Sequence, residues 1–304
     1  MATTTPRFQF TAVNGFFQQD SAPANAALEA VTLPGLGLLD RVYDTDDAFD
    51  PRGEKHPWER FAHYLDHLNR SGGGQTVYKL LYAARHGEGY HNVKEAEVGT
   101  AEWESHWAKL DGDGTITWAD AHLTPRGEAQ ARAMRTFWAD AASTLHLPLP
   151  PRHYASPLAR CLDTCALAFS GGGGGGPALP EGARFAPVVK ELLRERLGVH
   201  TCDRRRSRTW IRETHPAFGF EEGFAEQDGL WRPDVRETLA EHAVRVEAFL
   251  EDLFGSESAP IVSVTAHSGT ILALWEVIGH AEVRVAPGAI VPILIKAEEV
   301  RGEE

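Results

Sequence analysis

Short apolar segments that alternate with helical patterns constrain the fold of this chain more than any other feature. The segments expected to be strands are residues 77–84, a short run ending at residue 155, and residues 185–189, 261–266 and 290–295. Apolar runs of this length are typical of strands buried on both faces of a parallel sheet. We therefore predict an α/β fold with three layers, α/β/α, around a central and mainly parallel sheet.

The segments between these strands carry helix signals. Thr124 is a suitable N-cap, Pro125 lies in the first turn and Glu128 adds a negative charge there, so we predict a helix from this point to about residue 142. Helices are also expected over residues 157–168 and 269–278. The longest helix is predicted over residues 234–254, with an apolar stripe formed by Val235, Leu239, Ala243, Val246 and Leu250.

The first 74 residues differ in pattern from the rest. They contain an aromatic pair, Phe16-Phe17, and an amphipathic helical pattern over residues 57–65. A glycine-rich stretch, Ser71-Gly72-Gly73-Gly74, separates them from the first predicted strand. We therefore predict an N-terminal extension, residues 1–74, that packs on the outside of a domain formed by residues 75–304. A second glycine run, residues 171–176, is expected to be a mobile loop.

Composition narrows the class of protein. With 30 Lys and Arg against 43 Asp and Glu, the chain has a formal net charge of −13, which argues against nucleic acid as a partner. No uninterrupted apolar run approaches the roughly 20 residues of a membrane-spanning helix, and the N-terminal residues lack the pattern of a secretion signal. We expect a cytoplasmic protein with reduced cysteines and no membrane partner. Packing in a helix explains Cys161 and Cys165 better than a metal site does, because half of the usual ligands are missing.

Two histidines occupy equivalent positions in the predicted sheet. His86 follows the strand over residues 77–84, His267 follows the strand over residues 261–266, and a glycine comes soon after each one. Ligands of parallel α/β sheets bind beyond the carboxyl ends of the strands. A single histidine at such a place is more often a hydrogen-bonded core residue. Two histidines at matching strand ends instead favour a functional site.

Two arginines join these histidines at strand ends. Arg85 precedes His86, and Arg160 lies at another junction of strand and helix, in Ser156-Pro157-Leu158-Ala159-Arg160. A guanidinium group is a rigid fork of donors that suits phosphate oxygens, and helix N-termini add backbone N–H groups. In an acidic chain, an anionic substrate would require such a local positive pocket.

Five motifs occur in order along residues 78–295. They are Arg85-His86-Gly87-Glu88 with Asn92, Leu123-Thr124-Pro125-Arg126-Gly127-Glu128-Ala129-Gln130, Ser156-Pro157-Leu158-Ala159-Arg160-Cys161-Leu162-Asp163-Thr164, Leu193-Arg194-Glu195, and Val264-Thr265-Ala266-His267-Ser268-Gly269. Together they resemble branch 1 of the histidine phosphatase (phosphoglycerate-mutase-like) superfamily. The longer form of the first motif, with His200-Thr201-Cys202-Asp203-Arg204, is similar to a fungal and plant group of that superfamily.

The resemblance implies a phosphohistidine mechanism that needs neither a metal nor a cofactor. His86 would attack phosphorus, Glu195 would protonate the leaving oxygen, and the phosphate oxygens would be held by Arg85, Asn92, Arg160 and His267. Glu191 remains the alternative acid, because the spacing around this motif is loose. The candidates for lining the substrate pocket are Glu88, Tyr90 and Ser268, with His91 as a further one.

The resemblance also implies a cap over the site, built from insertions near residues 93–120 and 197–232. Trp103, Trp107 and Trp118 lie in the first insertion and form either an apolar wall for an organic leaving group or part of a packed core. The basic run over residues 204–208 either attracts an anion or is a loop with acidic partners. We interpret residues 111–114 as a turn rather than a calcium loop, because the terminal glutamate of such a loop is missing.

The predicted function is therefore phosphatase activity on a small organic phosphomonoester or diphosphate. A phosphoglycerate-type mutase is the first alternative. A second is that the pocket was recruited for isomerase or cyclase chemistry on a metabolite without phosphate transfer. A binding protein without activity is disfavoured, because both histidines, both arginines and a candidate acid are present. The oligomeric state is left open.

Overall fold

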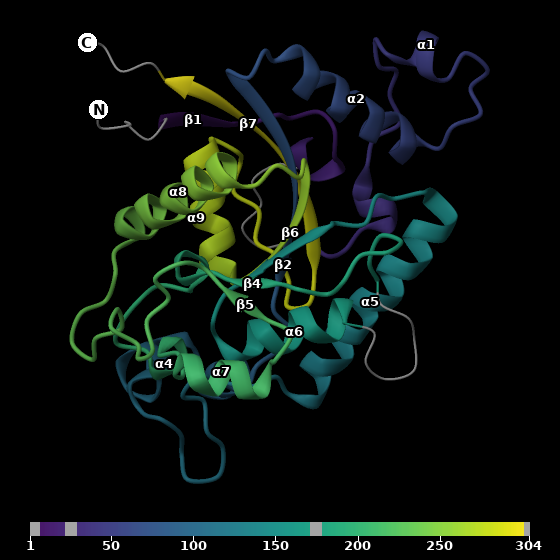
Figure 1. Cartoon of the computed structure of the whole chain (residues 1–304). Coiled ribbons are helices and arrows are strands. Elements are labelled where there is room, and N and C mark those ends of the chain that lie inside the picture. The colour runs from purple at the N-terminus through teal and green to yellow at the C-terminus, as the bar shows by residue number, and fades with distance from the viewer. Residues whose placement is uncertain (1–6, 22–28, 171–177, 301–304) are drawn as a thin grey trace.

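One sheet of seven strands runs through the part of the chain that the computed structural model describes, residues 7–21, 29–170 and 178–300 (Figure 1). The strands are β1 (Arg7–Ala12), β2 (Thr76–Arg85), β3 (Arg152–Ala155), β4 (Val188–Val189), β5 (Gly219–Phe220), β6 (Ile261–Ala266) and β7 (Ile290–Val300). Their order is β1-β7-β2-β6-β3-β4-β5, and only the two pairings of β7 are antiparallel. The mainly parallel sheet is confirmed.

The helices alternate with these strands. They are α1 (Asp46–Phe49), α2 (Pro57–Ser71), α3 (Tyr90–Val98), α4 (Thr100–Ser105), α5 (Pro125–Leu145), α6 (Ala159–Phe169), α7 (Arg208–Thr214), α8 (Leu239–Ser256) and α9 (Ser268–Ile278). Short 3-10 turns are η1 (Gln18–Ser21), η2 (Pro34–Gly37), η3 (Trp107–Lys109), η4 (Glu191–Leu193) and η5 (Thr201–Asp203). Among the described residues, no helix is both long and apolar enough to cross a membrane.

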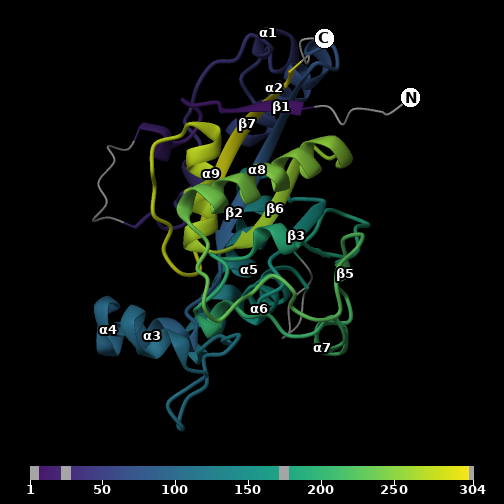
Figure 2. The ribbon, with the colours of Figure 1, turned by 90° about the vertical axis from the view of Figure 1, so that its left-hand side faces the viewer.

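Successive side chains of β2 point to opposite faces of the sheet, and the core accordingly has two layers. Leu80 and Tyr82 face a cluster that contains side chains of α2, α5 and α6, whereas Leu81 and Ala83 face a cluster built with α8 and α9. The two groups of helices lie on opposite faces of the sheet (Figures 1 and 2). The three-layer α/β/α architecture is confirmed, and it follows from the period of two along a strand that is buried on both faces.

Several element boundaries agree with their sequence signals. The Thr124 side chain accepts a hydrogen bond from the backbone N–H of Gly127 at 3.1 Å and caps α5. The strand over residues 261–266 and the helix after it are present as β6 and α9. The strand predicted over residues 185–189 is shorter, because only Val188 and Val189 pair with β3. The predicted loop over residues 171–176 lies outside the described residues.

The long helix α8 begins later than predicted. Thr238 caps it, with Glu241 completing a capping box, so the helix starts at Leu239 rather than at residue 234. Val235 and Leu239, which were assigned to the apolar stripe, are exposed. The buried face of α8 instead includes Val246, Phe249, Leu250, Leu253 and Phe254.

The N-terminal segment is more deeply integrated than predicted. β1 pairs with β7 along its whole length and forms an edge of the central sheet. Phe16, Phe17 and Phe61 are buried in the same core cluster as α5 and α6. Residues 1–74 were expected to pack on the outside, and this part of the expectation is wrong for the described residues. The strand β1 was missed because its partner lies almost 300 residues away in sequence.

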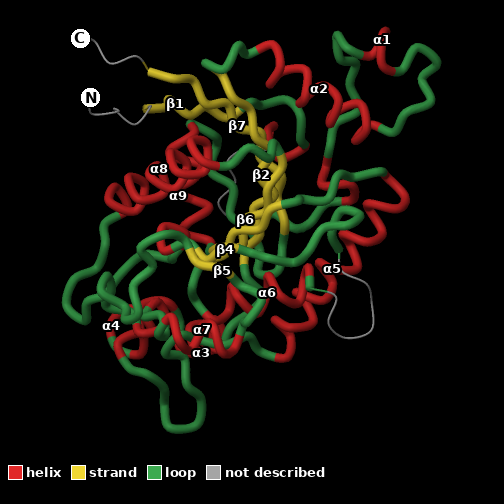
Figure 3. The backbone as a smooth tube through the Cα atoms, in the orientation of Figure 1, coloured by secondary structure: helices red, strands yellow, loops and turns green. Residues whose placement is uncertain are grey.

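The two segments predicted to form a cap contact each other beyond the carboxyl ends of the parallel strands. Trp103, Trp118 and Cys202 belong to one small apolar cluster, and the backbone N–H of Asp120 donates to the carbonyl of Thr201. Trp103 and Trp118 therefore belong to a packed core. Most of the chain between β4 and α8 is loop (Figure 3). That these segments act as a cap remains a prediction.

The stretch over residues 111–114 is a turn, as predicted. Gly112 forms an isolated bridge with Thr117, and the carboxylate of Asp113 accepts hydrogen bonds from the backbone N–H groups of Thr115 and Ile116. These backbone hydrogen bonds and the ammonium group of Lys94 lower the pKa of Asp113 to about 2.

Candidate functional site

A cavity of about 400 Å³ lies beyond the carboxyl ends of β2 and β6. Those strands are parallel neighbours, and the pairing of Arg85 with Ala266 brings the residues after each strand side by side. Eight of the residues proposed from the sequence line this cavity: Arg85, His86, His91, Asn92, Trp103, Arg160, Glu195 and Ser268. Segments that are more than 180 residues apart in sequence thus meet at the edge where α/β sheets bind ligands.

The tautomer of His86 follows from its partners. Its Nδ1 lies 2.7 Å from the carbonyl oxygen of Gly87, and a carbonyl can only accept, so Nδ1 carries the proton. Its Nε2 accepts from the Nε–H of Arg160 at 3.2 Å. The unprotonated ring nitrogen of His86 is therefore Nε2, and its lone pair points toward Arg160.

His86 is held in its neutral form. Burial lowers the pKa of His86 well below the ordinary value of 6.5, and the charges of Arg160 and Arg85 lower it further. The side chain is almost fully buried. The next residue, Gly87, contacts the backbone of Gly127 so closely that a side chain there would collide with it. The loop after β2 therefore needs glycine at this place to hold His86 where it is.

Arg160 is fixed by the segment around η5. Its Nη2 donates to Asp203 at 2.9 Å and its Nη1 donates to the carbonyl of Cys202 at 2.6 Å, and both Arg160 and Asp203 are buried. The other carboxylate oxygen of Asp203 accepts from Arg236 at 3.0 Å. Burial alone would raise the pKa of Asp203, but Arg236 and Arg160 outweigh it and hold that pKa below its ordinary value.

Arg85 and Asn92 are held by the backbone and keep donors free for a ligand. The Nη1 of Arg85 donates to the carbonyl of Val285 at 2.8 Å and contacts Glu29 at 3.2 Å. Its buried Nε–H has no partner among the described residues. The side-chain oxygen of Asn92 accepts from the backbone N–H of Gly89 at 3.0 Å, at the start of α3. Its amide group is thereby oriented at the cavity wall.

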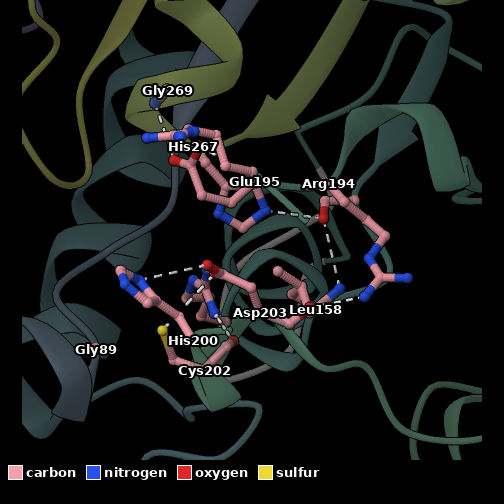
Figure 4. A network of polar contacts seen from close by, with 12 residues as sticks. Gly89, Leu158, Arg194, Glu195, His200, Cys202, Asp203, His267 and Gly269 are labelled. Atoms are coloured by element: carbon pink, nitrogen blue, oxygen red, sulfur yellow. Dashed lines mark hydrogen bonds and ion pairs between the residues drawn. The ribbon is translucent and has the colours of Figure 1, made fainter. Parts of the chain in front are cut away.

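Glu195, and not Glu191, lies at the cavity. The carboxylate of Glu195 accepts a hydrogen bond from the backbone N–H of Gly269 at 2.9 Å (Figure 4). It also accepts one from the backbone N–H of Arg196 at 3.0 Å. A side chain at position 269 would displace this carboxylate, so Gly269 allows Glu195 to occupy this position. Glu191 instead pairs with two buried arginines, Arg194 and Arg205. The structure therefore separates the two candidates that the sequence left open.

His267 lies behind His86 rather than at the cavity surface. It is fully buried, and its Nε2 contacts the hydroxyl of Ser156 at 2.8 Å. Its ring lies edge-on to the ring of His86, with 5.2 Å between centroids. That His267 contacts phosphate stays a prediction. Burial, together with Arg160, lowers the pKa of His267 well below 6.5.

Two of the proposed pocket residues point elsewhere. The carboxylate of Glu88 accepts from the hydroxyl of Thr124 at 2.8 Å and contacts Arg126, so it helps to fix the start of α5. Tyr90 lines a separate hollow beside His122. The chain turns into α3 at this point, which directs the next residue, His91, to the cavity instead. The ring of His91 lies 5.5 Å from that of His86.

Sequence reasoning missed further lining residues, which come from loops. They include Glu29, Glu104, Arg196, His200, Cys202, Asp203, Arg236 and Arg284. The only signal for three of them was the motif His200-Thr201-Cys202-Asp203-Arg204, to which no role was assigned. The basic run over residues 204–208 does not line the cavity. Arg204 pairs with Asp111, Arg205 with Glu191 and Arg206 with Asp120.

Two clusters bring together atoms of the kind that bind metals. His200, Cys202 and Asp203 have ligand atoms within 4.8 Å of one another, and so do His56, Glu59 and His146 at the surface. In the first cluster both oxygens of Asp203 already accept from arginines. A cation there would be repelled by two guanidinium groups, so this cluster fits arginine positioning better than metal binding.

The arrangement of a neutral histidine, two arginines and a carboxylate around one cavity agrees with the family comparison. A sequence profile of the histidine phosphatase superfamily (branch 1) matches residues 81–286. This chain belongs to the histidine phosphatase superfamily. The matched range contains all five motifs on which the resemblance rests.

Two fungal proteins are similar to this chain over most of its length. A protein of Arthroderma benhamiae named "Probable phosphoglycerate mutase" is 43% identical over 98% of this chain and 87% of its own length. A "Probable phosphoglycerate mutase" of Saccharomyces cerevisiae is 34% identical over 79% of this chain and 84% of its own length. The crystal structure of phosphoglycerate mutase from Bacillus anthracis covers 75% of this chain and 95% of that chain, with 16% identity and a TM-score of 0.46.

Proposed function

We propose that this histidine phosphatase superfamily member is a phosphatase that hydrolyses a small organic phosphomonoester or diphosphate through a phosphohistidine on His86. The observation that carries the proposal is the unprotonated Nε2 of the neutral His86, which lies 3.2 Å from the Nε of Arg160. Both residues line a cavity that Arg85 and Glu195 also line. A neutral imidazole with a fixed tautomer is a nucleophile, and fixed guanidinium groups stabilise the charge of a transferred phosphoryl group.

In the first step, Nε2 of His86 forms a bond to phosphorus while the bond from phosphorus to the leaving oxygen breaks. The Nε–H of Arg160 then exchanges its contact with His86 for a phosphate oxygen, which frees the lone pair for attack. Arg85 and Asn92 bind the other oxygens. Glu195 transfers a proton to the leaving oxygen, so that an alcohol departs. His267 supports the ring of His86 from behind.

In the second step, water attacks the phosphorus of the phosphohistidine. Glu195, now a carboxylate, takes a proton from that water, and the bond between phosphorus and Nε2 breaks. The products are inorganic phosphate and the neutral His86 from which the cycle began. The two backbone N–H groups that bind Glu195 hold the same carboxylate in place for both steps.

The first experiment is phosphate release from a panel of phosphoesters and diphosphates between about pH 5 and 8, with and without a chelator. We expect turnover that resists the chelator and is abolished in His86→Ala. His122→Ala is the matched control, because His122 is half-exposed and lies outside the cavity. Absence of turnover with every substrate, in a folded protein, would contradict the proposal and favour recruited non-phosphate chemistry or a binding role.

Phosphoglycerate-type mutase activity is the second candidate, because relatives covering most of this chain carry that name. A mutase would have to keep the phosphohistidine from water until the product returned in another pose. Product analysis by phosphorus NMR separates the two. Inorganic phosphate as the main product supports the phosphatase, whereas an isomeric phosphoester formed without phosphate release would support the mutase.

A further inference from the structure

Three side chains of the kind that bind metals meet at the surface, where two helices end. His56, Glu59 and His146 each bring one ligand atom, and these three atoms lie within 4.8 Å of one another. His56 is the N-cap of α2, Glu59 lies in the first turn of that helix, and His146 directly follows α5. None of these three residues lines the catalytic cavity. The proposed phosphatase chemistry therefore gives this cluster no role.

The spacing within the cluster fits ligands that share one metal ion. The Nδ1 of His146 lies 3.2 Å from Oε2 of Glu59. Zn²⁺ binds imidazole nitrogen and carboxylate oxygen at about 2.0 to 2.2 Å in a tetrahedron, which puts two ligand atoms about 3.3 to 3.6 Å apart. The third ring is also close, because the centroid of His56 lies 4.2 Å from that of His146. Small side-chain rotations are therefore enough to surround an ion.

The backbone holds the ligands in place. The Oε2 of Glu59 accepts from the backbone N–H of His56 at 2.9 Å, and this hydrogen bond lowers the pKa of Glu59, so the carboxylate is charged. His146 has a left-handed backbone conformation with a φ of 53°. Glycine or asparagine usually occupies such a place after a helix. Two helix ends that are far apart in sequence thus present their side chains at one point.

The ligand set selects the kind of ion. Two imidazoles and one carboxylate suit Zn²⁺, whereas Ca²⁺ and Mg²⁺ prefer oxygen ligands. His146 and Glu59 are 50% and 25% exposed, so water can reach a fourth coordination position. Lys55 lies 3.5 Å from Oε1 of Glu59 and is 44% exposed. Its ammonium group can move into solvent when a metal ion binds the carboxylate.

We propose that His56, Glu59 and His146 bind Zn²⁺, and that the ion links the start of α2 to the end of α5. The two rings bind it in their neutral form and Glu59 binds it as a carboxylate. Only the folded chain brings these ligands together, so the ion stabilises the attachment of the N-terminal segment to the rest of the protein. The inference goes beyond the proposed function and does not depend on it.

Calorimetric titration with Zn²⁺ at about pH 7.5 tests the proposal on the full chain, without a polyhistidine tag and freed of metal by a chelator. We expect one ion per chain with a Kd of about 1 µM, weaker than sites with four protein ligands. At 100 times that Kd, Zn²⁺ should raise Tm by about 4 °C. Ca²⁺ and Mg²⁺ should leave Tm unchanged.

Variants assign the ion to this cluster. His56→Ala and His146→Asn should each weaken Zn²⁺ binding by about 100-fold or more, since loss of even an outer partner of a ligand costs about 10- to 100-fold. Asparagine keeps the left-handed conformation without the imidazole. Lys55→Gln should tighten binding by about 3-fold, because it removes a competing charge. His67→Ala is the matched control and should keep the wild-type Kd, because His67 lies on α2 but contacts Ser71.

Co²⁺ in place of Zn²⁺ distinguishes this cluster from the one that contains Cys202. Imidazole and carboxylate ligands give no thiolate-to-metal charge-transfer band in the near ultraviolet, so we expect a Co²⁺ spectrum without that band. A thiolate band would overturn the proposal, and so would a Kd that is unchanged in His56→Ala and His146→Asn. Absence of saturable binding up to about 100 µM Zn²⁺, 100 times the expected Kd, would overturn it as well.

Discussion

Two buried arginines of this protein have similar partners and different surroundings. Arg160 and Arg194 are 1% and 0% exposed, and each pairs with an aspartate from the segment between β4 and α8. Asp203 lies 2.9 Å from Arg160, and Asp228 lies 2.6 Å from Arg194. By burial and the contact with aspartate alone, the two arginines could not be told apart, although Arg194 also contacts Glu191 at 3.3 Å.

The difference lies in what the remaining donors contact. Arg160 donates its Nε–H to His86 and lines the cavity, whereas the Nε–H of Arg194 has no partner among the described residues and the side chain does not line the cavity. Arg194 instead donates to the carbonyl of Asp203 at 2.6 Å. A buried ion pair therefore does not by itself mark a functional site. Contact with His86, the proposed nucleophile, distinguishes Arg160, whereas Arg194 holds the loop that contains Asp203.

The largest expected difference between the two pairs is in activity. Asp203→Asn removes the charge that orients Arg160, so kcat/KM for a phosphoester should fall by about 100- to 1,000-fold, as when one preorganised donor is lost. Asp228→Asn should change kcat/KM of the folded protein by less than about 3-fold, because its partner Arg194 neither contacts His86 nor lines the cavity. Steady-state kinetics on both variants checks this.

Separate measurement of kcat and KM for Asp203→Asn tests whether Asp203 acts as a positioning residue. Loss of orientation in the transition state lowers kcat, whereas a general weakening of the cap raises KM alone. Asp203→Glu should restore part of kcat, since it returns a carboxylate to Arg160. Equal loss of activity in Asp203→Asn and Asp228→Asn would contradict the distinction between the two pairs.

Stability should respond to both substitutions in the same direction. Each one removes a charged partner of a buried arginine, which costs about 2 kcal/mol of the free energy of unfolding. Urea denaturation of Asp203→Asn and Asp228→Asn, compared with the unaltered protein, measures the two losses. A loss confined to Asp203→Asn would mean that the Arg194 pair is not a structural support.

The smallest expected effect is on the titration of the site histidines. The charge of Arg160, after burial, lowers the pKa values of His86, His91 and His267 below 6.5. Arg160→Gln removes a positive neighbour, so protonation becomes easier and these pKa values should rise. Arg194→Gln should leave them unchanged. NMR titration of the histidine ring signals distinguishes the two variants.

The same pKa shifts predict how stability varies with pH. A histidine whose pKa is lower in the folded than in the unfolded state binds its proton mainly after unfolding, so stability falls as the pH drops below about 6.5. The slope is about 1.4 kcal/mol per pH unit for each such histidine. Because Arg160→Gln raises the folded-state pKa values, the fall in its stability with decreasing pH should level off at a higher pH than in the unaltered protein.

The sequence predicted those features that depend on local pattern. Thr124 caps α5 and marks its start. The apolar run over residues 261–266 indicated a strand buried on both faces, as β6 is. Strand polarity alone placed His86 and His267 at the same edge of the sheet, and the structure adds that their strands are neighbours. Local pattern also misled once: the apolar spacing of Val235 and Leu239 continued past Thr238, where the capping box begins the helix.

The features that the sequence could not predict depend on contacts between distant loops. Asp203 meets Arg160 across 43 residues, and Arg236 meets Asp203 across 33. Sequence periodicity cannot indicate such pairs, because Asp203 and Arg236 lie outside the regular patterns of helices and strands. The sequence also could not predict that the Tyr90 side chain points away from the cavity, because its direction depends on how the chain turns into α3.

The central claim is that His86 becomes phosphorylated, and direct trapping of that adduct tests it most directly. The protein is mixed with radiolabelled p-nitrophenyl phosphate, quenched within milliseconds in alkali, digested, and the labelled peptide is identified. We predict an adduct that is stable in alkali and labile in acid, on the peptide that contains His86, and absent from His86→Ala. Turnover without any labelled peptide, or a label that persists in His86→Ala, would contradict the account.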